Sequence, residues 1–164
     1  MNTVLYNQCV KEHSDSLMRY AFKVCGSRED SADAVQEAYI RLWSHRGEVN
    51  SEKVKSWLFT AVYRILIDWY RKNKRIQNPG EMPEQAAEEN LSIGHYSDPV
   101  VRALDSLSPT QKSIVMLRDI EEYPYEEIAE IMDLSLSQVK VYLFRARKKL
   151  RISLEPLRSG KKDK

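Results

Sequence analysis

The chain has 164 residues, of which 42% are hydrophobic and 30% charged, and its formal net charge is +2 at pH 7. This length allows one medium domain or two small ones. No apolar run approaches the roughly 20 residues of a membrane-spanning helix, and the first residues lack the charged-then-apolar pattern of a signal peptide. We therefore expect a cytoplasmic protein without membrane insertion.

Charge is distributed unevenly along the chain. Residues 53–75 hold seven Lys or Arg and one Asp, and residues 140–164 hold ten basic and two acidic residues. Residues 76–98 hold five acidic residues and no Lys or Arg. Two separate basic zones, each beside a mildly acidic unit, indicate two contacts along one polyanion.

Apolar residues recur at spacings of three and four, and no strand pattern is visible, so we expect an all-α fold. The first predicted helices cover about residues 3–25, 27–45 and 54–74, and Gly26 suits the C-cap of the first. The second helix carries polar and acidic residues beside an aromatic edge, a surface that suits a protein partner. Cys9 and Cys25 are neither a CxxC pair nor partnered with a set of closely spaced histidines, and we expect reduced thiols.

The third predicted helix combines aromatic and basic side chains. Trp57, Tyr63, Trp69 and Tyr70 alternate with seven Lys and Arg residues between positions 53 and 75. Basic side chains grip a phosphate backbone while exposed aromatic rings stack on unpaired bases, so the pattern is typical of single-stranded nucleic-acid binding. The two tryptophans lie twelve positions apart, close to one helical face, so both could instead belong to the core.

Nothing in the chain indicates catalysis. There is no Ser/His/Asp set, no glycine-rich loop and no cluster with metal-ligand spacing, and His13, His45 and His95 lie far apart. We therefore expect a protein that is not an enzyme and that holds no metal and no cofactor.

The stretch from 76 to 98 contains Pro79-Gly80, Pro83 and four Glu, which predicts a flexible acidic linker. The expected organisation is two small helical domains joined by this linker. It comprises an N-terminal domain at 1–75, the linker at 76–98, a C-terminal helix-turn-helix domain at 99–158 and a disordered basic tail at 159–164.

The C-terminal domain begins with a helix over about 99–106. Ser108-Pro109-Thr110-Gln111 then predicts the start of a helix over 109–121, because it combines a capping box with proline at the first helical position.

Residues 126–151 are typical of a helix-turn-helix. Asp133-Leu134-Ser135 forms the turn, and Ser135 with Gln138 forms a second capping box. The following helix has one apolar face (Val139, Leu143, Ala146, Leu150) and an opposite face with Lys140, Val141, Phe144, Arg145 and Lys148. A helix of this kind enters the major groove of DNA; the alternative is a helical hairpin whose charged face only meets water.

Residues 30–43, 56–72 and 104–150 together resemble one family, the extracytoplasmic-function sigma factors of bacterial RNA polymerase. Residues 30–43 (DSADAVQEAYIRLW) resemble its polymerase-binding helix, and residues 56–72 (SWLFTAVYRILIDWYRK) resemble its W-L-x-x-I-A-x-N-x-x-x-D-x-x-R-K segment. Residues 104–150 resemble its second domain, including the E-E-I-A, V-K and R-A-R-K-K-L elements. The likeness covers about 125 of the 164 residues, in the same order and spacing.

The resemblance implies three sets of contact residues. The first would bind the clamp helices of the largest subunit of core RNA polymerase: Asp33, Gln36, Glu37, Tyr39, Leu42 and Trp43. The second would bind the unpaired strand of the −10 element: Lys53, Ser56, Trp57, Tyr63, Arg64, Asp68, Arg71 and Lys72. The third would bind the duplex −35 element: Ser137, Gln138, Lys140, Val141, Phe144, Arg145 and Lys148.

The resemblance also implies an anti-sigma factor as a partner, and a linker that runs toward the polymerase active centre. The sequence departs from the family pattern at three positions. Arg64 stands where the family usually has Asn, and Asp133 replaces the usual turn Gly, a position that Asp tolerates. Gln138 replaces Thr, and its amide can bond adenine or complete the capping box.

The prediction is a sigma factor that directs promoter-specific transcription initiation. A stand-alone helix-turn-helix regulator with an N-terminal interaction domain is the alternative, and it predicts DNA binding without polymerase. A third possibility is a protein that sequesters polymerase or an anti-sigma factor; the two basic faces argue against it.

Overall fold

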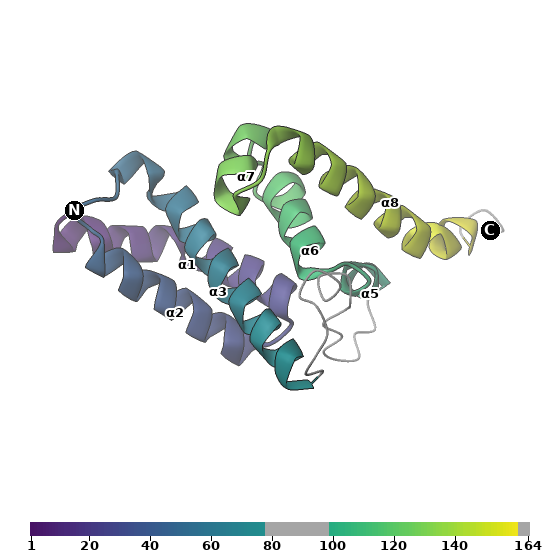
Figure 1. Ribbon diagram of the computed structural model, residues 1–164, viewed down its shortest axis with the longest axis horizontal. Helices are drawn as coiled ribbons and strands as arrows, with labels where there is room; N and C mark the ends of the chain where they lie inside the picture. The colour runs from purple at the N-terminus through teal and green to yellow at the C-terminus, as the bar shows by residue number, and fades with distance from the viewer. Residues whose placement is uncertain (78–98, 161–164) are drawn as a thin grey trace.

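The computed structural model describes residues 1–77 and 99–160, and within these ranges all regular structure is helical. Figure 1 shows the arrangement of the helices. The elements are α1 (Thr3–Cys25), α2 (Arg28–Ser44), the 3-10 helix η1 (Ser51–Lys53), α3 (Val54–Gln77), α5 (Pro99–Asp105), α6 (Pro109–Val115), the π-helical segment η2 (Met116–Ile120), α7 (Tyr125–Met132) and α8 (Leu136–Gly160). No described helix combines the length and the hydropathy that a membrane crossing would need.

Local capping explains where the helices begin and end. The Asn2 side chain accepts a hydrogen bond from the Leu5 amide, and the Ser27 side chain accepts one from the Asp30 amide. Gly26 ends α1 in the left-handed conformation with φ 75°, as the sequence predicts. At α6 the predicted capping box is present, because the Ser108 and Gln111 side chains each accept the other residue's amide.

Helices α1, α2 and α3 pack against one another and form the N-terminal unit. Their inward faces are buried: Leu17, Tyr20, Ala21 and Val24 on α1, Ala34, Val35, Ala38 and Leu42 on α2, and Leu58, Ala61 and Ile65 on α3. Trp57 and Trp69 are only partly buried and lie at the edge of this core. Both cysteines are free thiols.

Helices α5 to α8 form the C-terminal unit. The predicted inward face of α8 is confirmed, since Val139, Leu143 and Ala146 are buried. Asp133 ends α7 with φ 53°, so it adopts the left-handed conformation at the turn where the family usually has Gly. The ammonium group of Lys112, 2% exposed, lies 3.2 Å from an Asp105 carboxylate oxygen and ties α6 to α5.

The two units lie directly against each other, with α6 next to α1 and α7 next to α3 (Figure 1). Their buried residues form one continuous hydrophobic cluster that includes Leu17 and Phe59 from the first unit and Leu117 and Tyr123 from the second. The C-terminal part of α8 extends away from this body.

Three boundaries differ from the sequence-based expectations. Helix α3 continues through Gln77, past the expected domain end at 75. Helix α8 continues through Gly160, so Ser159 and Gly160 are helical and do not belong to a disordered tail. The helix expected over 109–121 changes to π geometry at Met116. Residues 78–98 of the expected linker and residues 161–164 of the expected tail lie outside the described residues.

Candidate functional site

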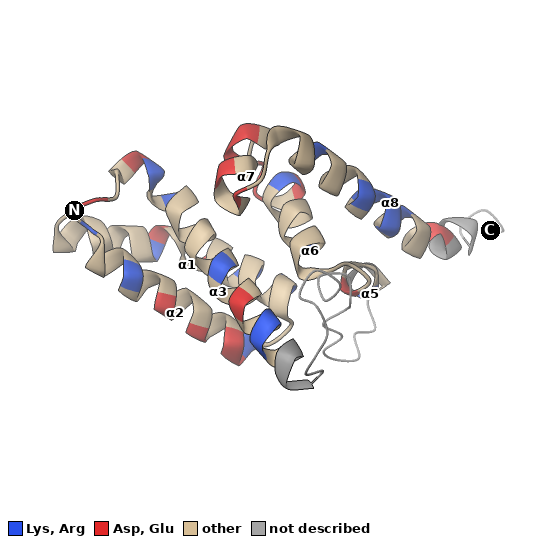
Figure 2. Ribbon diagram, in the orientation of Figure 1, with Lys and Arg blue, Asp and Glu red and all other residues tan. Residues whose placement is uncertain are grey.

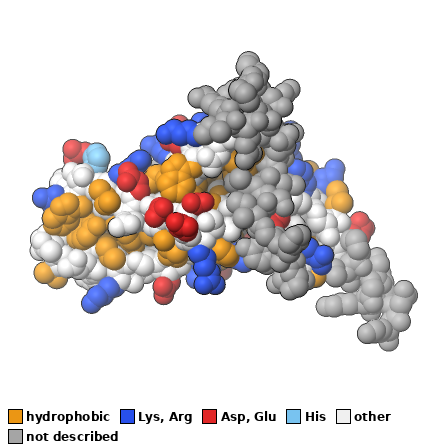
Figure 3. Space-filling view, turned by 90° about the horizontal axis from the view of Figure 1, so that it is seen from below, with side chains coloured by type: hydrophobic (Ala, Val, Ile, Leu, Met, Phe, Trp, Pro, Cys, Tyr) orange, Lys and Arg blue, Asp and Glu red, His pale blue; other side chains and the backbone are white. Residues whose placement is uncertain are grey.

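The exposed side of α2 joins acidic, basic and apolar side chains. Together with α3 it forms a groove of ≈ 390 Å³ lined by Asp33, Gln36, Glu37, Ile40, Arg41, Ile65, Asp68, Trp69 and Lys72. Arg41 and Glu37 form an i, i+4 ion pair of 2.9 Å on its rim. On the face of the molecule seen in Figure 3, hydrophobic side chains lie beside a group of acidic ones. A groove that combines charged and apolar side chains suits the side of another protein's helix.

Trp43 lies at the far end of the same helix. Its ring is 37% exposed and packs edge-on against Tyr6 at 5.0 Å, with the Arg46 guanidinium 4.1 Å from its centroid. Ile40, one turn earlier on α2, is 54% exposed. A partly exposed tryptophan held in place by its neighbours is typical of an interface anchor.

Two of the six residues predicted to bind polymerase, Tyr39 and Leu42, are buried in this structure. Leu42 has no exposed surface, and Tyr39 is 8% exposed. The Tyr39 hydroxyl lies 3.1 Å from the Ser14 hydroxyl and donates to the Val10 carbonyl at 3.3 Å. Burial raises the pKa of Tyr39. Both residues hold α2 against α1 and so position the exposed residues of α2.

The residues predicted on α3 divide between three sides of that helix. Trp57, Arg64 and Arg71 follow one another at intervals of seven and therefore share one outward stripe. Trp57 is partly buried, and its ring lies beside His45 with the ring centroids 6.2 Å apart. Asp68 and Lys72 instead line the groove shared with α2.

The remaining predicted α3 residues face the C-terminal unit. Ser56 and Tyr63 are half-buried there, and burial raises the pKa of Tyr63, while a hydrogen bond with Thr110 of α6 opposes this rise. Lys53, at the end of η1, lies 4.0 Å from Glu130 of α7 and remains exposed. The eight residues therefore do not form one continuous free surface in this structure.

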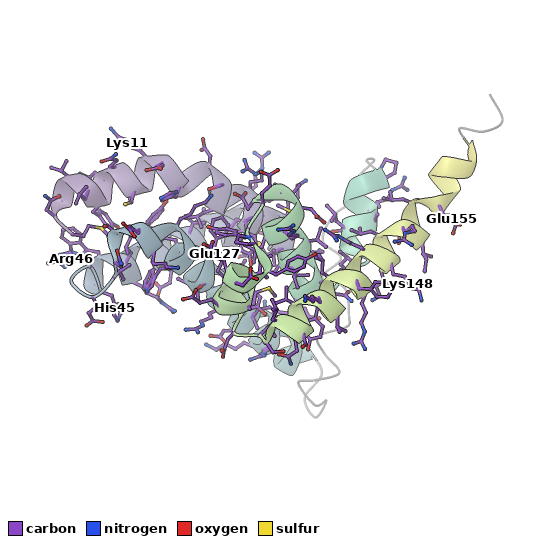
Figure 4. All side chains as sticks on the ribbon, turned by 90° about the horizontal axis from the view of Figure 1, so that it is seen from above. Lys11, His45, Arg46, Glu127, Lys148 and Glu155 are labelled. Atoms are coloured by element: carbon purple, nitrogen blue, oxygen red, sulfur yellow. The ribbon has the colours of Figure 1, made fainter. Side chains whose placement is uncertain are left out.

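Helix α8 presents all seven residues predicted for the −35 contact to solvent: Ser137, Gln138, Lys140, Val141, Phe144, Arg145 and Lys148. Phe144 is 66% exposed, although it is large and apolar. Figure 2 shows basic residues along α8, and Figure 4 shows Lys148 on the part of the helix that extends beyond the body. Apolar and cationic side chains on one exposed helical face suit base edges and phosphates together.

Two polar side chains of α8, those of Arg147 and Gln138, form hydrogen bonds within the protein. Arg147 binds Asp119 of η2 through Nε at 3.4 Å and through Nη2, and this hydrogen bond raises the pKa of Arg147, so its guanidinium supports the fold. The Gln138 side chain accepts a hydrogen bond of 2.9 Å from the Ser135 amide, and the Ser135 hydroxyl accepts one of 3.1 Å from the Gln138 amide. Of the two roles open to Gln138, the structure therefore shows the capping box.

Comparison with known proteins gives the family. The model of sigma-70 region 2 matches residues 9–76, and the model of sigma-70 region 4 matches residues 97–150. The RNA polymerase sigma factor SigV of Bacillus subtilis is 36% identical over 151 residues, which cover 89% of each chain. The chain belongs to the sigma-70 family. It is a sigma factor of the extracytoplasmic-function group, and such factors direct transcription initiation.

Other matches agree. The sigma factor YlaC of Bacillus subtilis is 31% identical over 159 residues, covering 90% of this chain and 88% of the relative. The fold resembles the sigma factor RpoE of Bartonella quintana, solved with its anti-sigma factor NepR, with a TM-score of 0.73 at 21% identity over 92% of this chain and 96% of that one. It also resembles CnrH, solved with the cytosolic domain of CnrY, with a TM-score of 0.69 at 20% identity over 94% and 90%.

In family terms, most of α1 and all of α2 lie in region 2 with nearly all of α3, while α5 to α7 and α8 up to residue 150 lie in region 4. The predicted polymerase-binding set lacks four residues that line the region 2 groove: Ile40, Arg41, Ile65 and Trp69. Ile40 could have been assigned to the polymerase-binding set from the sequence, because it is an apolar residue on the polar side of α2, where no core residue is expected. The position of Ile65 against the groove depends on how α2 and α3 pack together.

Proposed function

We propose that the chain uses three separate surfaces to select promoters for RNA polymerase. The groove and Trp43 edge of α2 bind the clamp helices of the largest polymerase subunit. The outward stripe of α3 captures unpaired bases of the −10 element, and the exposed face of α8 reads the duplex −35 element. The chain contributes binding free energy and no chemistry of its own, and the place of action is the cytoplasm.

The observation that carries this proposal is the division of α8 between its two faces. Val139, Leu143 and Ala146 are buried, while Lys140, Val141, Phe144 and Arg145, which lie between them in sequence, are exposed. No ion pair within the described residues involves Lys140, Arg145 or Lys148, so these cations are available for phosphates and base edges.

The stripe on α3 supports the second surface. Trp57 supplies a partly exposed ring, and Arg64 and Arg71 supply cations on the same side of the helix. Stacking of a base on an aromatic ring is worth about 1–3 kcal/mol and works with any base. Arg64, which stands where the family usually has Asn, can bind a phosphate or stack on a base with its planar guanidinium.

Two double variants, one on α2 and one on α8, distinguish polymerase binding from recognition of the −35 element. Purified protein is titrated with core bacterial RNA polymerase by fluorescence anisotropy, and transcription from a selected promoter is measured in parallel. The double variant Trp43→Ala, Gln36→Ala is expected to bind polymerase at least about tenfold more weakly, in line with the loss of an interface anchor. The double variant Arg145→Glu, Lys148→Glu is expected to bind polymerase normally and to lose promoter-specific transcription.

Each variant is the control for the other, because each changes exposed residues of a different region. Undetectable binding of the wild-type chain at micromolar polymerase would refute the proposal. The stand-alone regulator is not favoured, since region 2 matches the family as well as region 4 does. The solved complex of RpoE with the anti-sigma factor NepR also supports an anti-sigma factor as a further partner.

A further inference from the structure

Helix α3 supplies one wall of the groove that it forms with α2. The α3 residues of the lining are Ile65, Asp68, Trp69 and Lys72, and their spacing places them on one side of the helix. The family resemblance assigns Asp68 and Lys72 to the −10 strand. Ile65 and Trp69 belong to none of the three implied contact sets. We name these four residues the α3 wall.

The α3 wall faces a different direction from the outward stripe of Trp57, Arg64 and Arg71. A helix turns by about 100° per residue, so Lys72 lies about 80° and Trp69 about 140° round the axis from Arg64. None of the three stripe residues lines the groove. A strand bound along the stripe would therefore pass beside the α3 wall and not through the groove.

The direction of the two helices gives the order of the side chains along the groove. Helices α2 and α3 run in opposite directions (Figure 1). Asp33, near the start of α2, therefore lies at the same end of the groove as Lys72 of α3. The middle of the groove has Glu37 on the α2 side and Asp68 on the α3 side. The other end has Ile40 of α2, which is 54% exposed.

The groove carries an excess of negative charge. Its lining holds three carboxylates and two cations, so its formal charge is −1. The Glu37 carboxylate is already held by Arg41 at 2.9 Å. Asp68 is exposed and takes part in none of the ion pairs between described residues. This charge repels a phosphate, whereas a basic side chain of a protein would meet a carboxylate and, on the same wall, the Trp69 ring, which also attracts cations.

We propose that the α3 wall is the second half of the polymerase-binding site and that Asp68 binds a basic side chain of the docked helix. The occupant is a partner helix that carries Lys or Arg next to apolar residues. Its cation meets Asp68 and Trp69, and its apolar side chains meet Ile40. Asp68 and Lys72 thus belong with the residues that bind protein and not with those that bind DNA. This inference rests on the proposed docking of polymerase on α2.

The test measures binding of the full-length protein to core bacterial RNA polymerase by fluorescence anisotropy, without DNA. Asp68→Asn removes the charge at nearly constant size and should weaken binding about three- to tenfold at about 0.1 M salt. The difference from the wild type should shrink at about 0.5 M salt, because salt screens a charge pair. Asp68→Glu should restore most of the affinity. The matched control is Asp15→Asn, the same change at an exposed position of α1 outside the groove, and it should leave the affinity unchanged.

Thermal unfolding of each variant separates a contact with polymerase from a change in the fold. Because Asp68 is exposed, Asp68→Asn should keep the melting temperature within about 2 °C of the wild type. A melting temperature that falls together with the affinity would assign Asp68 to the fold and contradict the inference.

Three further results would overturn the inference. One is that Asp68→Asn binds like the wild type while the Trp43→Ala, Gln36→Ala variant is weakened; docking on α2 then stands, and α3 has no part in it. Another is that Asp68→Asn and Asp15→Asn weaken binding equally, because net charge alone then accounts for the loss. The third is that the wild-type chain does not bind polymerase, in which case the proposed function fails and the inference fails with it.

Discussion

Leu143 and Phe144 are neighbours on α8, and alanine should affect them in opposite ways. Leu143 is 2% exposed and belongs to the shared core. A buried Leu→Ala substitution loses the transfer free energy of the side chain and leaves a cavity, at a cost of about 2–5 kcal/mol. A loss of about 3 kcal/mol in a cooperative unit of this size lowers the melting temperature by about 6–12 °C.

Phe144 is 66% exposed, so Phe144→Ala should change the free energy of unfolding by at most about 0.5 kcal/mol. Its effect should appear in DNA binding. Loss of one base contact costs about 1–3 kcal/mol, which weakens binding about 5- to 150-fold. Leu143→Ala, measured well below its melting temperature, should retain most of its affinity for the same duplex.

The assay pairs thermal unfolding, followed by circular dichroism, with anisotropy on a duplex selected from a random library with the wild-type chain. Ile152→Ala is the matched control, since Ile152 is also an exposed apolar residue of α8, at 59%, and lies outside the proposed contact. It should leave stability and DNA binding unchanged. If Phe144→Ala lowers the melting temperature as much as Leu143→Ala does, the assigned faces of α8 are wrong.

Three further outcomes follow from the described contacts. Lys112→Met should lower the free energy of unfolding in urea by about 1–3 kcal/mol, because it removes the Lys112 ammonium from the Asp105 carboxylate, whose 23% exposure lets water replace part of the contact; an unchanged midpoint would contradict this. Arg147→Ala should cost at most about 1 kcal/mol through loss of the exposed Asp119 pair and leave the affinity for the selected duplex within about twofold, which a titration checks. Burial raises the pKa of Tyr20 above its unfolded value of about 10, so the folded state favours the neutral phenol. The free energy of unfolding therefore keeps its full Tyr20 contribution below about pH 10 and loses it as the pH rises further. Urea unfolding between about pH 8 and 11 should show a smaller loss of stability in Tyr20→Phe than in the wild type.

The helices and their faces were largely predictable because their signals are local. Ser108 with Gln111 and Ser135 with Gln138 form capping boxes within three residues of sequence, and both are present. The spacing of Val139 and Leu143 is enough to define the buried face of α8, since a helix repeats every 3.6 residues. The seven predicted −35 residues on the opposite face are accordingly exposed.

The polymerase-binding set was only partly predictable. A motif match assigns Tyr39 and Leu42 together with Trp43, yet the first two are buried against α1 and only Trp43 reaches the surface. Tyrosine suits a core and an interface equally well, because it has an apolar ring and a polar end. Tyr39 is in the core because two residues of α1 bind its hydroxyl group. The Val10 carbonyl accepts its hydrogen bond, and the Ser14 hydroxyl lies within hydrogen-bonding distance.

By itself, the sequence determined the all-α fold, the helix boundaries to within a few residues, the buried and exposed faces of α8, and the family. Only the tertiary structure decided which side of α3 is free and which side region 4 covers. Tyr20 and Ser113 lie 93 positions apart, and Arg19 and Glu121 lie 102 apart. Helical periodicity and capping act within about one or two turns, so they carry no information on contacts between such distant residues. Those contacts form only when two complete helical units meet, and they depend on shape and charge that both units supply.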